Sequence, residues 1–140
     1  MEGEGQDLAE ALGAAGDVLG QALTLYIPSR DGLTDEEFAN QSWVREAADI
    51  LAQIGKGYAI MPPATGGYLK QDGSVVEELV TLVYAYIEPD SFEFALPRLR
   101  EFLHRMGRET RQEMVVLELS GADEAAFFRI TEYDGSAQEE

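Results

Sequence analysis

The chain has 140 residues, of which 45% are apolar, and it contains no cysteine. That length and apolar share suit one domain with its own core and exclude a chain that is disordered throughout, while the lack of cysteine excludes disulfides, thiolate metal sites and a cysteine nucleophile. The formal net charge of −17 at pH 7 excludes direct binding of nucleic acid over most of the surface, because such binding depends on basic contacts to phosphate.

Residues 1–20 are expected to form a flexible or weakly helical acidic arm. Leucines recur there at helical spacing, but three glycines in the same stretch each weaken a helix by about 1 kcal/mol relative to alanine. The first strand is predicted from Ala22 to Ile27, where leucine and isoleucine occupy every second position, and Pro28 ends it.

The first helix is predicted to end at Gly55. Thr34 and Glu37 match a capping box, which predicts a helical region that begins near Thr34. From Trp43 to Ile54 the apolar residues recur at helical spacing along one face, and Gly55 is typical of the left-handed residue that stops a helix.

The middle of the chain predicts strands joined by turns. A strand over residues 57–61 is expected to be interrupted by the proline pair and the glycine pair that follow it. The Asp72-Gly73 dipeptide predicts a tight turn that pairs residues 68–70 with residues 74–77. The second of these strands continues to Ile87, and its β-branched and apolar content predicts a central place in the sheet.

The last third of the chain predicts a second helix and two strands. Pro97 suits the first turn of a helix that runs to Met106, with Gly107 as its stop. Strands are predicted over residues 114–119 and 126–131, and residues 133–140 are expected to form a disordered acidic tail.

The predicted elements follow the order βαββαβ with one more strand at the end. This order predicts an α+β fold of the ferredoxin-like type, with two helices on one face of an antiparallel sheet and an extra C-terminal strand. We expect residues 21–132 to form a single domain of this kind, whose other sheet face is open or covered by a partner.

Five of the ten cationic side chains lie within fourteen residues, beside the only histidine. Guanidinium groups bind phosphate and carboxylate groups bidentately, so this stretch is a candidate surface for an anion or an acidic partner. The alternative is that these arginines pair with the protein's own carboxylates, since Glu101 and Arg105 have i,i+4 spacing. The candidate residues are Arg100, His104, Arg105, Arg108 and Arg111.

His104 belongs to a residue type that often performs acid–base catalysis, but no nucleophile accompanies it in the sequence pattern. We therefore expect it at a surface or half-buried helix position. No carboxylates have the spacing of a calcium loop, no histidine pair exists for zinc, and no glycine pattern matches a phosphate loop. The sequence predicts no metal and no cofactor.

Three tyrosines are candidates for a second surface. Tyr26 alternates with the apolar residues of the first strand, and Tyr84 and Tyr86 share one side of the central strand. On the open face of the sheet they would form an aromatic floor suited to sheet-to-sheet dimerisation or to an apolar ligand. The alternative is that they pack under the helices, and a period of two leaves both interpretations open.

Several short stretches resemble small uncharacterised bacterial proteins with a ferredoxin-like core. They are Leu25-Tyr26-Ile27, Gly67-Tyr68-Leu69 before Asp72-Gly73, Val75-Val76-Glu77-Glu78, Leu82-Val83-Tyr84, and the stretch from Arg100 to Glu109. The resemblance spans about residues 22–120. It implies this fold and dimerisation through the sheet, and it implies no activity.

Three functions are compatible with these patterns. The first is a non-enzymatic binding or regulatory module, a homodimer acting through protein–protein contacts. The second is an acidic inhibitor that occupies the nucleic-acid-binding site of a basic partner protein, as a counter-defence protein of a mobile element does. The third is a small dimeric-barrel enzyme that acts on an organic acid with His104, Arg100 and Tyr84. We favour the first, because the sequence shows no catalytic constellation.

The sequence also predicts where the protein works. The first cationic residue is Arg30, so the preceding residues lack the basic start of a signal peptide. The longest unbroken apolar run, from Leu82 to Ile87, is far shorter than the roughly 20 residues that span a membrane as a helix. We expect a cytoplasmic protein with no membrane contact.

Overall fold

The computed structural model describes residues 8–15, 20–121 and 124–135. Residues 8–12 form a short helix, and the rest of the expected arm at residues 1–7 and 16–19 lies outside the described residues. The elements that follow are β1 (Gln21–Pro28), α2 (Gln41–Gly55), β2 (Ala59–Ile60), β3 (Ala64–Leu69), β4 (Val75–Tyr86), α3 (Pro89–Glu109), β5 (Val115–Gly121) and β6 (Ala125–Ile130).

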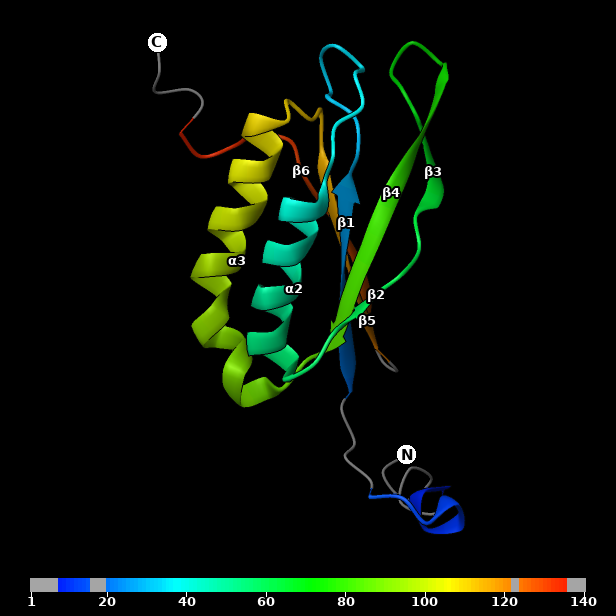
Figure 1. Cartoon of the computed structure of the whole chain (residues 1–140), viewed down its shortest axis with the longest axis vertical. Coiled ribbons are helices and arrows are strands. Elements are labelled where there is room, and N and C mark those ends of the chain that lie inside the picture. Colours follow the sequence, from blue (N-terminus) through cyan, green and yellow to red (C-terminus); the bar gives the residue numbers. More distant parts are fainter. Residues whose placement is uncertain (1–7, 16–19, 122–123, 136–140) are drawn as a thin grey trace.

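The strands form one antiparallel sheet in the order β2-β4-β1-β5-β6, and β3 pairs with β4 beside β2. Helices α2 and α3 lie next to each other on one face of this sheet, and no described element covers the other face (Figure 1). This arrangement confirms the predicted α+β, ferredoxin-like fold. The extra C-terminal strand is also present, because β6 pairs with β5 at the edge of the sheet.

The core lies between the two helices and the sheet face that they cover. Alternate residues of a strand point to one side, and in β1 the residues that point toward the helices are Leu23, Leu25 and Ile27, all buried. Burying a side chain of this size contributes about 1.5–3 kcal/mol, so the core fixes which face of each strand meets the helices. The largest fully buried side chains are Leu25, Ile27, Ile50, Leu51, Ile54, Val83, Phe102 and Met106.

Helix α2 ends where the sequence predicts but begins later. Gly55 is the last helical residue, but the expectation that it takes the left-handed conformation is wrong. Lys56 takes that conformation, and its amide donates to the carbonyl of Ala52. The expected capping box at Thr34 and Glu37 is wrong. Those residues lie in a loop held by the Asp31 carboxylate, which accepts backbone hydrogen bonds in a local turn that competes with a helix.

Helix α3 is longer than the predicted helix at both ends. It begins at Pro89, whose missing N–H suits a helix start, and it continues through Pro97, which was expected in the first turn. The predicted stop at Gly107 is also wrong. The helix ends at Glu109, and the hydroxyl of Thr110 donates to the carbonyl of Met106 over 2.6 Å.

The strands after α2 differ from the prediction at the glycine pair. The predicted strand over residues 57–61 is reduced to β2, and Pro62-Pro63 separates β2 from β3. Gly66 and Gly67 do not interrupt pairing, because β3 keeps a regular register with β4 across both of them. The predicted hairpin is confirmed, with Gly73 at φ +91° and the Asp72 carboxylate accepting from the Ser74 amide.

The packed part of the chain extends at least to Asp134, beyond the domain boundary expected at residue 132. Tyr133 packs against the core, and its hydroxyl donates to the carbonyl of Gln112 over 2.8 Å. Residues 136–140 of the expected tail lie outside the described residues. Within the described ranges, no helix has the length and apolarity needed to cross a membrane.

Candidate functional site

The three candidate tyrosines lie on the sheet face that points away from the helices. Register pairs Thr24 with Tyr84 and Tyr26 with Leu82, so these residues share one side of β1 and β4, opposite to the buried Leu25 and Val83. Tyr84 and Tyr86 meet edge to face, with ring centroids 6.4 Å apart. The open-face interpretation of the tyrosines is therefore the correct one.

This open face is hollowed at one end, around Tyr26. The hollow has a volume of about 460 Å³ and reaches from β3 across β4, β1 and β5 to β6. That volume is within the range of small-molecule sites, about 300–1,000 Å³. We call it the open-face hollow. Its polar and aromatic lining includes Tyr26, Tyr68, Glu78, Gln112, Phe127 and Arg129.

Glu78 is the carboxylate within the hollow. It lies on β4 in the alternation of Val76, Val80 and Leu82, and its Oε2 atom is buried without a hydrogen-bond partner among the described residues. Burial raises the pKa of the Glu78 carboxyl, which the nearby Arg30 partly offsets and the Asp35 charge reinforces. An unpartnered buried carboxylate oxygen is costly, so a ligand that donates to it or carries a positive charge would be stabilised there.

Two tyrosines border the hollow, and both have perturbed hydroxyls. Tyr26 donates a hydrogen bond of 3.0 Å to Oε1 of Glu118 on β5. Burial and this carboxylate raise the pKa of Tyr26. Burial also raises the pKa of Tyr68, with further contributions from the charges of Glu113 and Glu78. Both hydroxyls therefore stay protonated at neutral pH. Tyr26 donates its proton to Glu118, and Tyr68 can donate its proton to a ligand.

Gln112 enters the hollow in a fixed orientation. Its Nε2 group donates to the carbonyl of Arg30 over 2.7 Å and to that of Thr110 over 3.2 Å. The side-chain carbonyl oxygen is left as an acceptor. The hollow thus combines aromatic walls with carboxylate, hydroxyl and amide groups, and with one guanidinium at Arg129.

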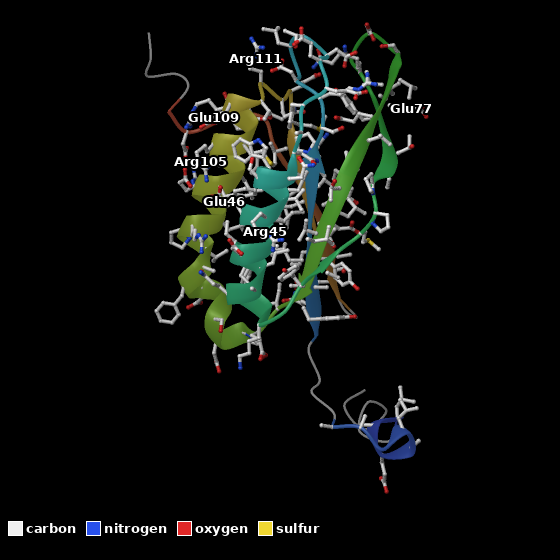
Figure 2. All side chains as sticks on the ribbon, viewed as in Figure 1. Arg45, Glu46, Glu77, Arg105, Glu109 and Arg111 are labelled. Carbon is white, nitrogen blue, oxygen red and sulfur yellow. The ribbon has the colours of Figure 1, made fainter. Side chains whose placement is uncertain are left out.

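The arginine-rich helix lies on the opposite side of the sheet, and Arg105 is at its centre. Its guanidinium pairs with Glu46 of the neighbouring helix α2 (Figure 2). It also pairs with Glu101, whose Oε2 lies 2.9 Å from Nε. It also lies 5.3 Å from the ring centroid of Trp43 and 5.9 Å from that of Phe102. Arg105 therefore joins the two helices through its own protein's carboxylates.

Arg100, His104 and Arg108 converge on Asp134, just after β6. Arg100 donates two hydrogen bonds to the Asp134 carboxylate, at 2.9 and 3.1 Å, and Arg108 donates to its backbone carbonyl. The Arg100 guanidinium holds the pKa of the Asp134 carboxyl below its usual range. Nδ1 of His104 accepts the Asp134 amide, so the imidazole proton belongs on Nε2.

Arg111 pairs with Asp31 at 3.1 Å. Like Arg100 and Arg105, it already binds a carboxylate of this chain, so an external anion would have to displace that carboxylate. An anion-binding role for these arginines stays a prediction.

The predicted site residues do not form one site. Arg100 and His104 lie on the helix side of the sheet, whereas Tyr84 lies on the open side, so the organic-acid constellation does not assemble. The sequence reasoning also missed the hollow's Glu78, Gln112 and Arg129. One signal was available for Glu78, because it is a single acidic residue in an otherwise apolar alternation along β4.

In the described part of the chain, no three histidine or carboxylate side chains gather in a way that could hold a metal ion.

Neither a protein-family model nor a curated protein matches the chain. Among solved structures it is similar to a phage SAM lyase in complex with S-methyl-5'-thioadenosine, with a TM-score of 0.59 and 15% identity over 85% of this chain and 97% of that one. The apo state of a phage SAM lyase gives a TM-score of 0.57 and 16% identity over 81% and 90%. A divalent cation tolerance protein from Thermus thermophilus gives a TM-score of 0.45 and 15% identity over 86% and 91%. At these identities the likeness to the phage lyase shows a shared fold and nothing further.

Proposed function

We propose that the open-face hollow binds a sulfonium nucleoside of the S-adenosylmethionine (SAM) class, and that the protein cleaves it in the manner of a SAM lyase. The observation that carries the proposal is the lining of one hollow by aromatic rings together with the half-buried carboxylate of Glu78, whose Oε2 atom is buried and has no hydrogen-bond partner among the described residues. A fold shared with a phage SAM lyase supports the choice of ligand class.

The carboxylates near one end of the hollow favour a cationic centre at that end. Glu78 and Glu118 lie on the same sheet face as Tyr26, and the whole chain carries −17. A sulfonium has a fixed positive charge that cannot be lost to the solvent as a proton. It would therefore be attracted to the carboxylates and also to the faces of the tyrosine rings, as other organic cations are.

The aromatic lining favours a ligand with a flat ring. Tyr26, Tyr68 and Phe127 border the same hollow, and aromatic side chains bury much apolar area at low entropic cost. An adenine ring can stack on such side chains, while the hydroxyl of Tyr68 and the free carbonyl oxygen of Gln112 remain for polar contacts.

The reaction needs no cofactor, because the substrate contains its own leaving group. When the bond between the sulfonium sulfur and the amino-acid carbon breaks, its electron pair passes to sulfur and S-methyl-5'-thioadenosine is released as a neutral thioether. The four-carbon fragment is completed either by attack of its own carboxylate on that carbon, which closes a ring, or by loss of a proton from the neighbouring carbon to a carboxylate of the site or to water. A site that orients the chain and excludes water would favour this cleavage over hydrolysis.

The test is to incubate the purified full-length chain with SAM and measure S-methyl-5'-thioadenosine by liquid chromatography and mass spectrometry. Binding is measured in parallel by calorimetry. The informative variant is Glu78→Gln, and its matched control is Glu77→Gln, the exposed neighbour on the other side of β4. We expect the wild type and the control to release the thioether and Glu78→Gln to lose at least about tenfold, the effect of one charge-assisted contact.

Each result decides part of the proposal. A wild type that binds neither SAM nor the thioether would overturn it. Binding without release of thioether would retain the ligand class and reject the lyase step. Equal loss in Glu77→Gln would show that the effect of Glu78 is not specific to the hollow.

A second candidate function is protein binding through the open face by a homodimer. The observation that favours it is the edge-to-face pair of Tyr84 and Tyr86 outside the hollow, because the Tyr86 side chain is 55% exposed. Sedimentation analysis of the wild type and Tyr86→Ser tests it, and a concentration-independent monomer would count against it. A basic nucleic-acid-binding partner is the alternative occupant, given the charge of −17. Both candidate functions suit a protein of the cytoplasm, which remains its proposed location.

A further inference from the structure

We propose that Arg129 binds the carboxylate at the amino-acid end of the ligand, and that it makes the open-face hollow selective for a zwitterionic amino-acid nucleoside. The inference rests on the proposed function and adds the second end of the binding site. Neither the sequence pattern nor the arginine-rich helix pointed to this residue.

The register of the last two strands places Arg129 on the open face. It pairs with Val116 of β5, and Phe127 pairs with Glu118, whose carboxylate accepts the Tyr26 hydroxyl. Residues 127 and 129 of β6 therefore point to the same side as Tyr26. Both line the hollow at its β6 end.

Among the described residues, four of the eight arginines pair with a carboxylate, and Arg129 is one of the four that do not. Arg30, Arg100, Arg105 and Arg111 all pair with carboxylates within 4 Å. Among the residues that the structure describes, Arg129 has no such pair, and its side chain is exposed. In a protein with 27 acidic residues, a guanidinium beside a hollow and without a carboxylate is available for a ligand's carboxylate.

The two charged ends of the hollow are well separated. Glu78 lies on β4 and Arg129 on β6, and the sheet order puts β1 and β5 between them. Three strand spacings amount to about 14 Å between the backbones. A ligand that engages both groups needs a cationic centre and a separate anionic group, and the long side chains of Glu78 and Arg129 span part of the distance between the strands. An amino acid joined to a nucleoside through a sulfonium carries both charges.

The experiment compares three ligands by calorimetry on the full chain. SAM carries the carboxylate, decarboxylated SAM lacks only that group, and S-methyl-5'-thioadenosine lacks the whole amino-acid chain. The variants are Arg129→Gln and Arg129→Lys, with Arg98→Gln as the control for an exposed arginine of α3. Thermal melts confirm that each variant folds.

We expect Arg129→Gln to weaken SAM binding by about tenfold to a hundredfold, the usual effect of losing a charge-assisted pair. Arg129→Lys should retain part of the affinity, because it keeps the charge and loses the bidentate geometry. The affinities for decarboxylated SAM and for the thioether should change by less than about threefold in either variant. The wild type should bind SAM more tightly than decarboxylated SAM, by the same factor by which Arg129→Gln weakens the binding of SAM.

Unchanged SAM affinity in Arg129→Gln would overturn the inference, and so would an equal loss for decarboxylated SAM, since that is a general charge effect. The proposed function fails separately. If SAM binding is abolished by Glu78→Gln but unaffected by Arg129→Gln, the hollow is the site and only the role of Arg129 is wrong. If the wild type binds neither SAM nor the thioether, both proposals fall.

Discussion

Nδ1 of His104 accepts a hydrogen bond of 2.8 Å from the backbone amide of Asp134, and the side chain of the same aspartate is held by Arg100. Asp134 therefore already binds Arg100 and His104, two of the side chains that the sequence predicts as candidates for ligand binding. An external anion at this position competes with a carboxylate whose geometry is already bidentate.

Asp134→Asn should remove a stabilising contribution that depends on pH. The folded-state pKa of Asp134 is lowered, chiefly by its hydrogen bonds from Arg100, so its contribution is present above the ordinary aspartate pKa of about 3.9 and is lost as pH falls through the folded pKa. The difference in unfolding free energy between wild type and Asp134→Asn should be seen at pH 7 and shrink below about pH 4. Denaturant titrations at several pH values measure it. Asp49→Asn, on an exposed aspartate of α2, is the control for the loss of one surface carboxylate.

Gly107→Ala should destabilise the wild type and stabilise a variant that lacks the Tyr133 ring. A methyl group at Gly107 would overlap the Tyr133 ring, which costs about 1–3 kcal/mol, although alanine is the better helix former by about 1 kcal/mol. In the Tyr133→Ala background the overlap is gone and only the helix preference remains. Thermal melts of the four proteins measure both effects. The same sign in both backgrounds would contradict the role assigned to Tyr133.

Arg105→Gln should lower the unfolding free energy by about 1–2 kcal/mol, because it removes a partly buried ion pair between α2 and α3 together with the contact on the Trp43 ring. Part of the loss should disappear in high salt, which screens the charges. Arg98→Gln, on an exposed residue of the same helix, should change stability by less than about 0.5 kcal/mol. Equal effects of the two substitutions would mean that Glu46 and Glu101 do not stabilise the fold through Arg105.

Tyr26→Phe should cost about 1 kcal/mol of stability, because it removes the hydrogen bond to Glu118 and keeps the ring. Burial, reinforced by Glu118, raises the pKa of Tyr26. The contribution of the protonated hydroxyl to the unfolding free energy is therefore complete below the ordinary tyrosine pKa of about 10, and it is lost as pH rises through the folded pKa. Chemical unfolding between pH 7 and 11 should show the two curves converging at alkaline pH. The exposed Tyr86 gives the control, Tyr86→Phe.

Glu78→Gln should be at least as stable as the wild type at neutral pH, although it impairs ligand binding. Burial raises the pKa of Glu78, so the folded protein favours the protonated side chain. The stability that this preference contributes is complete below the ordinary glutamate pKa of about 4.3, and it is lost as pH rises through the folded pKa. Glutamine resembles the protonated form at every pH. The variant's advantage should therefore vanish in acid and grow toward neutrality. A variant that is less stable at pH 7 would show that the Glu78 carboxylate is stabilised in the free protein.

Local patterns along the chain account for much of the fold. The alternation in β1 and the apolar stripe from Trp43 to Ile54 identify the core faces, because burial requires side chains of one kind on one side. The Asp72-Gly73 turn is predictable for a similar reason, since glycine adopts the positive φ that the turn requires. These features depend on residues close in sequence.

The candidate site was much less predictable. Glu78, Gln112 and Arg129 come from three different segments, and only the pairing of β4, β1, β5 and β6 brings them to one hollow. The tyrosines show the same difficulty, because a period of two predicts that Tyr26 and Leu25 face opposite sides of one strand but does not predict which side the helices cover.

The amino-acid sequence by itself therefore determined the element order, the fold class and the composition of each strand face. The tertiary structure decided that α3 continues past Gly107, that the Tyr133 ring packs against this glycine, and that the arginines of α3 meet carboxylates from α2 and from the segment after β6. It also decided where the hollow lies. Local propensities act over a few residues, whereas these contacts join residues 26 to 92 positions apart, whose meeting depends on the packing of the whole sheet.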